Sequence, residues 1–433
     1  MTVRDYIDSY YKDSKVESDS FPPVADHVEC EVAIIGGGLA GLTAARELLK
    51  LGKHVVLIEE NRVGWGASGR NGGFVSDGYA EGLGKLEDWL GLEQAKALFS
   101  LSRQGTDYVR HTIDELKAPG VSVEDGWLRV LRHDDAAGLE ARVTETNERF
   151  GTSYSYWPTE RVREVLSSGR YFQGMDDPRA FHIQPLNYAL ALARDIKRLG
   201  GAICEHSKAR CLIKEAGSWR IETDDGGSVR AGAVLLCGSA YMKDLYPRLE
   251  RAVLPVATYV ITSEPMGERL SDAIRYRGCI GDTRRAGDYY RLVDGGERLL
   301  WGGRMTTRRS EPAKLAQMLK RDIVSIYPQL GDFEVTHAWA GLMGYCLHKM
   351  PILKELEPGI WAATATGGHG LNATASIGMA AAQGIAGVSD HYKLFAPFKA
   401  RWGGGPVGRV GTQMVYWGLQ AMDWWEERRS HHP

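Results

Sequence analysis

The sequence predicts an α/β protein, α+β overall, with two interleaved domains, of which one has a parallel sheet and the other a mostly antiparallel sheet. Residues 29–58 show a strand, a glycine loop, a helix and a second strand, which is the expected size of a parallel βαβ unit. A second glycine cluster and a small-residue helix follow Trp361. Residues 254–303, between these signals, show short β-rich runs separated by turn residues. Because related signals open and close the chain, we expect interleaved rather than sequential domains.

Local patterns support each element in turn. Glu29–Ile35 and Val55–Ile58 are short β-branched runs, typical of buried strands, and Leu39–Leu51 has helical apolar spacing with Gly52 as its C-cap. Further helices are predicted at 98–116, 185–200 and 314–327, and further strands at 233–237, 254–262, 289–293 and 298–303. We expect an N-terminal arm over 1–28, a Rossmann-like cofactor domain over 29–85, 155–245 and 340–400, a substrate domain over 86–154 and 246–339, and a C-terminal aromatic segment over 401–433.

Composition excludes several classes of function. The 433 residues are 43% apolar and 25% charged, with a net charge of −2 and both signs interspersed, so we expect no nucleic-acid partner. The six cysteines form no CxxC pair, so no metal site is predicted. The polar N-terminus lacks a signal-peptide core and no stretch of 18 apolar residues occurs, so we expect a cytoplasmic protein without an integral membrane segment.

The first glycine loop predicts a dinucleotide site. Gly36, Gly38 and Gly41 form GxGxxG between a strand and a helix, around Leu39 and Ala40. These glycines allow a tight turn, close approach of a pyrophosphate and close packing of helix on strand. Glu59 ends the second strand, followed by Glu60, where a carboxylate would hold a ribose hydroxyl and disfavour the 2′-phosphate of NADP.

A second small-residue loop distinguishes FAD from NAD. Residues 62–73 follow the acidic strand directly, where a loop of small residues can run beside a ribityl chain and a flavin ring. A disordered glycine linker is the alternative, which the embedded Trp65, Arg70 and Asn71 disfavour. The residues of this segment predicted to bind the cofactor are Arg62, Gly66, Ala67, Ser68, Arg70, Asn71, Gly72 and Gly73.

Taken together, the motifs resemble the D-amino-acid oxidase superfamily, in its glycine oxidase and sarcosine oxidase branch. They are Gly36–Leu42, Gly64–Gly73, His182–Leu186, Trp339–Gly341, Met350–Pro351 and Gly367–Gly370, in an order that covers nearly the whole chain. The resemblance implies an FAD-dependent amine oxidoreductase, in which a hydride passes to flavin N5 and the resulting imine hydrolyses to an aldehyde. It also implies that the Gly367–Gly370 loop and the helix near Asn372 lie against the flavin, where a helix N-terminus stabilises negative charge.

The resemblance extends the predicted cofactor site. The added residues are Cys237, Gly238, Gly341, Gly368, His369, Gly370, Leu371 and Asn372. Some relatives attach FAD covalently through a cysteine, whose place Gly341 takes here, with Cys346 five residues later. We therefore expect non-covalent FAD.

Met343 argues against a simple amino acid as substrate. In amino-acid oxidases of this family an arginine follows the Trp-x-Gly-Leu stretch and holds the substrate carboxylate, but Met343 follows Leu342 here. This departure fits a small amine, with a γ-glutamylputrescine-like amine as the best guess. The predicted substrate residues are Met343, Trp301, Trp339 and Arg291, and the predicted catalytic residues are Arg304, Tyr290, His369 and Lys349.

Three questions stay open at this stage. The electron acceptor is O2 or another molecule, because residues 298–301 lack the lysine that sarcosine oxidases place there. The alternatives in function are an FAD-dependent dehydrogenase or oxidase of secondary amines or N-methyl amino acids, and a flavin-binding protein without activity. A homo-oligomer is compatible with the sequence.

The C-terminal segment is rich in aromatic residues. Tyr416, Trp417, Trp424 and Trp425 could lie on a membrane or a partner. Asp423, Glu426 and Glu427 oppose attraction to anionic lipid, so we expect a helix packed back onto the body.

Overall fold

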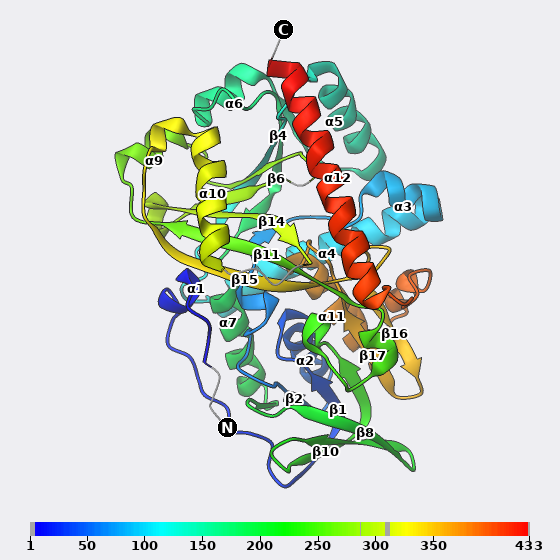
Figure 1. Cartoon of the computed structure of the whole chain (residues 1–433). Helices are drawn as coiled ribbons and strands as arrows, with labels where there is room; N and C mark the ends of the chain where they lie inside the picture. The colour runs from blue at the N-terminus through cyan, green and yellow to red at the C-terminus, as the bar shows by residue number, and fades with distance from the viewer. Residues whose placement is uncertain (1–4, 286, 308–311, 432–433) are drawn as a thin grey trace.

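Two β-sheets form the frame of the molecule, one in the lower half and one in the upper half of Figure 1. The computed structural model describes residues 5–285, 287–307 and 312–431. Within these residues the α/β class with a mixed, largely antiparallel second sheet is confirmed.

The lower sheet holds the predicted βαβ unit. Its strands are β1 (His27–Ile35), β2 (Val55–Ile58), β7 (Ala202–Cys204), β8 (Ala209–Glu215), β9 (Ser218–Thr223), β10 (Ser228–Leu236), β16 (Ile352–Glu357) and β17 (Ile360–Thr364). The path β17-β10-β1-β2-β7 is parallel throughout. All four residues of β2 are buried, as expected for a parallel strand covered on both faces.

Helices and a hairpin cover the two faces of the lower sheet. The helices α2 (Leu39–Lys50), α4 (Leu92–Leu116), α7 (Pro185–Arg198) and α11 (Leu371–Ile385) share one apolar core with alternate side chains of β1, including Val32 and Ile34. The opposite side chains of β1, including Ala33 and Ile35, pack with the β8–β9 hairpin. Because both faces of the sheet are covered, the loops at the carboxyl ends of β1 and β2 are the part of this sheet that a ligand can reach.

The upper sheet comes from widely separated segments. Its strands are β3 (Phe74–Val75), β4 (Glu124–Val130), β5 (Ser155–Trp157), β6 (Gly174–His182), β11 (Leu254–Ser263), β12 (Cys279–Asp282), β13 (Tyr289–Val293), β14 (Arg298–Thr306) and β15 (Val335–Tyr345). One face packs on α6 (Thr159–Val165), α9 (Glu268–Ala273) and α10 (Pro312–Ile326). The other face looks toward the lower sheet.

The remaining helices lie at the periphery. They are α1 (Tyr10–Asp13), α3 (Leu83–Leu90), α5 (Ala136–Phe150), α8 (Pro247–Glu250) and α12 (Gly405–His431). The arm predicted over 1–28 is therefore not wholly irregular, because it contains α1 and the start of β1. The domain limits stay a proposal, and β5 and β6, placed by the sequence in the cofactor domain, pair in the upper sheet.

Candidate functional site: a dinucleotide cleft that opens into a second cavity

The first cleft lies where β1 and β2 end. Gly36 has φ +114°, and an added Cβ there would lie 3.0 Å from the backbone carbon of Cys237, so only glycine fits. Gly38 caps α2, and an added Cβ would lie 2.9 Å from the Ser68 hydroxyl. The start of α2 therefore faces a narrow space in which the N–H of Leu39 already donates to the Ser68 hydroxyl at 3.0 Å, and a helix N-terminus of this kind suits a pyrophosphate.

Glu59 stands at the end of β2 with its carboxylate fixed. Its Oε2 accepts the N–H of Gly37 at 2.7 Å and its Oε1 accepts the N–H of Asn61 at 2.8 Å. Burial raises the pKa of Glu59 to about 7, with Glu60 and Glu205 adding to the effect. A ribose that donates two hydroxyls would favour the ionised carboxylate.

Most of the predicted cofactor residues line this cleft. They are Gly36, Gly38, Leu39, Ala40, Glu59, Glu60, Gly66, Ala67, Ser68, Asn71, Cys237, Gly238, Gly368 and Gly370. Five others line only the second cavity described below, and four line neither space: Gly41, Arg62, Gly73 and Asn372.

These four residues support the walls of the site instead. An added Cβ on Gly41 would collide with the carbonyl of Gly36, so this glycine sets helix packing. Arg62 pairs with Glu205 at 3.0 Å, and Asn372 donates to the carbonyl of Gly78 at 2.8 Å. Gly73 has φ +85° and turns the second glycine loop toward β6. The sequence predicted that these four residues bind the cofactor. In the structure they instead hold in place the segments that line the site.

The second glycine loop fits a flavin. The side-chain amide of Asn71 donates to the carbonyls of Ala67 and Ser68 at 3.0 and 2.9 Å, which closes the loop on itself. Arg70 donates to the carbonyl of Trp65 at 2.7 Å, and its buried Nη2 has no hydrogen-bond partner among the described residues. A buried donor without a partner carries a free-energy cost, so it indicates a ligand acceptor at this place.

A loop from the far end of the chain closes the cleft. Ala365 has φ +59° just before Gly367, and α11 begins at Leu371 beside this turn. The Nε2 of His369 lies 3.0 Å from the carbonyl of Ser76, so we assign its proton to Nε2. Burial lowers the pKa of His369 to about 4, which keeps the imidazole neutral at pH 7.

A second cavity continues from the cleft on the side of the upper sheet. Ala67, Asn71, Met343, Gly368 and Gly370 line both spaces, which makes them neighbours. Arg70, Gly72, Gly341, His369 and Leu371, all predicted from the sequence, line the second cavity only. Its other walls carry Phe74, Trp127, Tyr289, Tyr345 and Tyr416, together with Asp282, Arg284, Arg285 and Asp288.

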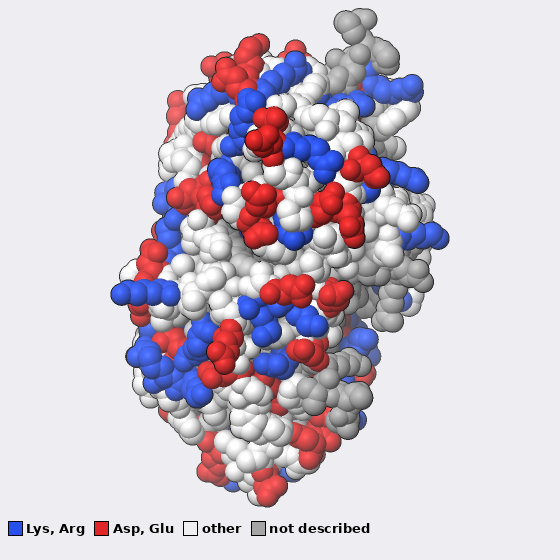
Figure 2. All heavy atoms as spheres, turned by 90° about the vertical axis from the view of Figure 1, so that its left-hand side faces the viewer, with Lys and Arg blue, Asp and Glu red and all other residues white. Residues whose placement is uncertain are grey.

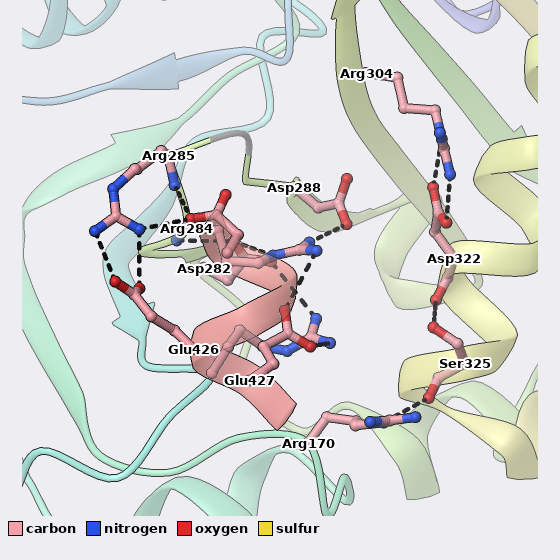
Figure 3. Close-up of polar contacts among 12 residues, drawn as sticks. Arg170, Asp282, Arg284, Arg285, Asp288, Arg304, Asp322, Ser325, Glu426 and Glu427 are labelled. Atoms are coloured by element: carbon pink, nitrogen blue, oxygen red, sulfur yellow. Dashed lines mark hydrogen bonds and ion pairs between the residues drawn. The ribbon is translucent and has the colours of Figure 1, made fainter. Parts of the chain in front are cut away.

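An ion-pair network forms the wall of this second cavity nearest α12 (Figure 3). Arg284 bridges Asp282 and Asp288, each at 2.7 Å, and Arg285 binds Glu426 of α12 through two N–H groups at 2.8 and 2.9 Å. Arg132, Arg284 and Arg285 face five acids here, namely Asp282, Asp288, Asp423, Glu426 and Glu427. Burial raises the pKa of Asp288 to about 7, against the opposing attraction of Arg284.

Tyr290 and Trp301 face the core and not the cavity. Their rings stack at 4.1 Å, and the Tyr290 hydroxyl lies 2.6 Å from that of Tyr327. Alternate residues of a strand point to opposite faces, so Tyr289 lines the cavity while Tyr290 turns away. We correct the predicted catalytic role of Tyr290 and the substrate role of Trp301.

Arg291 and Trp339 are structural. Arg291 donates to the carbonyls of Gly72 and Ile183 at 2.7 and 2.9 Å, and Trp339 donates to the carbonyl of Arg70 at 2.9 Å. Both side chains are buried beyond the edge of the cavity. They hold the second glycine loop rather than a substrate, which corrects their assignment.

Arg304 and Lys349 also lie away from both spaces. Arg304 forms a two-pronged ion pair with Asp322 of α10 at 2.7 and 2.8 Å, drawn apart from the network in Figure 3. Lys349 is exposed in the turn after β15. Neither residue lines the cleft or the second cavity, so we correct their predicted catalytic roles.

Sequence reasoning missed much of the second cavity. Trp127, Asp282, Asp288, Tyr345 and Tyr416 line it without having been predicted as site residues. The indole Nε1 of Trp127 is buried without a hydrogen-bond partner among the described residues, so it is a candidate ligand donor. Only Tyr416 had a sequence signal, in the aromatic C-terminus.

Comparisons with known proteins agree with this geometry. Residues 31–384 match the model of the family described as DAO, FAD dependent oxidoreductase. The chain is 29% identical to the gamma-glutamylputrescine oxidoreductase of Escherichia coli, over 91% of this chain and 92% of that protein. It is 32% identical to the probable oxidoreductase OrdL of Rhizobium meliloti, over 84% of each chain.

A solved structure shows the same fold. The glycine oxidase of Geobacillus kaustophilus superposes with a TM-score of 0.72 at 20% identity, over 86% of this chain and 99% of that one. The site fits the cofactor of the family, because the glycines and Glu59 of the cleft supply the space and the carboxylate, and the buried Arg70 of the adjoining cavity supplies a donor. The chain therefore belongs to the FAD dependent oxidoreductase (DAO) family, with FAD as its cofactor.

Proposed function

We propose that this oxidoreductase oxidises the carbon–nitrogen bond of a small amine, giving an imine that hydrolyses to an aldehyde, with a γ-glutamylputrescine-like amine as substrate. One observation carries the proposal. The dinucleotide cleft opens into a second cavity through five shared residues, and the far wall of that cavity combines aromatic rings with acids. A substrate in the second cavity would adjoin the cofactor at this junction.

The wall chemistry favours a cationic substrate. Asp282 and Asp288 stand among Trp127, Tyr289 and Tyr416, and aromatic faces together with carboxylates are the usual partners of an ammonium group. Burial raises the pKa of Asp288 to about 7, with Asp282 and Asp322 adding to the effect. A bound cation would favour the ionised carboxylate.

The same wall disfavours a simple amino acid. Met343 stands at the junction of the two spaces, where a thioether cannot form a two-pronged pair with a carboxylate. Arg284 and Arg285 are each paired with two or more carboxylates of the protein, among them Asp282, Asp288 and Glu426, so a substrate carboxylate would have to compete with these acids. Recognition of a carboxylate close to the reacting carbon is therefore poorly supported, whereas a distant polar group on the amine is compatible.

The residues of the chain act by positioning. Bound FAD supplies the hydride acceptor. The aromatic walls hold the substrate and exclude water, and Asp288 attracts the protonated amine, which must lose one proton before the neutral amine can donate a hydride. The Nε2–H of the neutral His369 donates a hydrogen bond to the carbonyl of Ser76. His369 therefore forms part of the cavity wall and does not act as an acid. The buried thiol of Cys346 lines neither space, which supports non-covalent FAD.

An anaerobic panel of amines tests the proposal. We expect the visible absorbance of FAD to bleach with γ-glutamylated or N-substituted amines and to persist with glycine and D-alanine. Rapid bleaching by D-alanine alone would refute the proposed substrate class. Bound FAD that no amine reduces would favour the non-catalytic alternative. Acid precipitation that leaves the yellow colour in the pellet would contradict non-covalent attachment.

The electron acceptor gives a second candidate, an FAD-dependent dehydrogenase of secondary amines or N-methyl amino acids. Among the described residues no lysine lines the second cavity. The cations that line this cavity are arginines, Arg70, Arg284 and Arg285, and not the lysine that sarcosine oxidases place by the flavin. We expect less than one peroxide per aldehyde in air, and full peroxide yield would establish an oxidase.

A further inference from the structure

The C-terminal helix α12 turns its polar side toward the protein. Gln413 accepts the Thr306 hydroxyl at 2.8 Å, Asp423 accepts Arg285 at 3.0 Å, and Glu427 accepts Arg132 at 2.9 Å. Gln413 and Asp423 are buried against the body. The helix does pack back as the sequence predicted, but through polar contacts.

The apolar side of α12 faces outward. We call this side the outer face, and it comprises Val407, Val410, Met414, Val415, Trp417, Met422, Trp424 and Trp425, all exposed. Val407 is 78% exposed, Met414 64% and Trp424 57%. A surface helix normally shows the opposite arrangement, with apolar residues toward the core. An exposed apolar stripe along a helix of this length marks an interaction surface.

The charge left on this part of the surface is positive. Residues 391–422 contain four basic residues, Lys393, Lys399, Arg401 and Arg409, and neither Asp nor Glu, although Lys393 is paired with Asp390 at 2.8 Å. Lys399, Arg401, Arg409 and Arg428 are exposed, and the guanidinium of Arg428 lies 4.6 Å from the ring centre of Trp424. The acids that argued against lipid in the sequence, Asp423, Glu426 and Glu427, are paired with Arg285 and Arg132.

This combination separates α12 from other parts of the surface. On the face that lies to the left in Figure 1, basic and acidic side chains are intermixed (Figure 2). On α12 the acids are instead paired with the body, while tryptophan, apolar residues and arginine are exposed, and such exposed residues are the features of a helix that lies in the headgroup region of an anionic bilayer. Self-association through the outer face would place like charges opposite each other, which disfavours a second copy.

We propose that α12 is a peripheral membrane helix, which lies flat on an anionic lipid surface through its outer face. Within the described residues no helix has the length and apolar character needed to cross a bilayer. Burial of the outer face supplies the affinity, and the surrounding cations select anionic lipid. Because Tyr416 of α12 also lines the second cavity, lipid binding would bring that cavity close to the bilayer surface.

Sedimentation of the full FAD-loaded chain with vesicles tests the proposal. We expect partition into vesicles with about one third phosphatidylglycerol to exceed that into phosphatidylcholine alone by at least about tenfold, and to weaken with salt. The double variant Met414→Ser with Trp424→Ser should lower binding about tenfold or more. Arg428→Glu should lower it about tenfold at low salt. Trp89→Ser, at an exposed tryptophan on α3, is the matched control and should bind as the unmodified chain does.

The absorbance of bound FAD checks that each variant is folded. Equal sedimentation without vesicles, with neutral vesicles and with anionic vesicles would overturn the proposal. Unchanged binding by both the double variant and Arg428→Glu would do the same. A mass measured by light scattering that corresponds to a dimer, and that falls to a monomer in the double variant while no vesicle binds, would assign the outer face to a second copy instead.

Discussion

The dinucleotide cleft and the second cavity share a boundary but are built in different ways. The cleft is lined by loops at the ends of β1, β2 and β10, where Gly36, Gly38 and Gly238 leave room for a cofactor. The second cavity is richer in aromatic side chains, and its lining residues come largely from β4, β12, β13, β15 and α12. A tightly packed glycine loop tolerates little change, whereas a wall of large side chains sets which substrate enters.

Substitution in the first glycine loop, at the start of α2, should have the largest effect. We expect Gly41→Ala to weaken FAD binding about a hundredfold, because the new methyl group collides with the carbonyl of Gly36 and overpacking of this kind costs up to about 3 kcal/mol. Gly84→Ala is the control, since an added Cβ on that helical glycine meets no atom within 4 Å. Titration of the apoprotein with FAD measures both, and equal affinity would mean that the loop can adjust.

The same contrast explains what could be predicted from the sequence. Gly36, Gly38 and Glu59 lie within one βαβ unit, where local pattern and known crossover geometry determine their positions. The loop at Gly367–Gly370 came from family resemblance and not from local pattern, yet its residues do line the two spaces.

The second cavity could not be predicted in the same way. It depends on the pairing of β4 with β12, in which Leu128 stands opposite Ile280, and no local pattern specifies a register between strands so far apart. Where the strand was predicted correctly, the face was not. By residue type, Tyr289 and Tyr290 are equally good candidates for a ligand contact. Which of them faces the cavity depends on which face of the strand each side chain occupies, because alternate residues point to opposite faces.

A change in the side-chain wall should affect substrate more than cofactor. We expect Asp288→Asn to lower kcat/KM for the amine about thirtyfold, or roughly 2 kcal/mol, because it removes the charge that offsets the ammonium group. The effect should lie mostly in KM, and FAD content should be unchanged. Asp322→Asn removes an acid of an ion pair outside the cavity and is the control. An equal loss in both variants would indicate a structural role only.

The affinity for FAD should depend on pH through Glu59. Its pKa of about 7 means that the carboxyl is largely protonated at pH 6 in the protein without FAD. A ribose that donates to the ionised carboxylate requires loss of this proton, so affinity should fall as pH falls, by about tenfold from pH 8 to pH 6. Glu59→Gln should bind more weakly and lose this dependence. A flat profile in the unmodified protein would show that Glu59 does not titrate on binding.

The smallest effect is expected at His369, which lines the second cavity. Because its pKa is lowered to about 4, it is neutral over the whole range in which an amine substrate loses its proton, and Nε2 only donates to the carbonyl of Ser76. His369→Gln retains a donor, so kcat should change by less than about threefold and the pH profile of kcat/KM should keep its shape. If kcat/KM of the unmodified protein changes near pH 6.5 and that change is absent from the variant, His369 would instead be a titrating acid or base. The cavity wall would then act in proton transfer, and positioning alone would no longer account for catalysis.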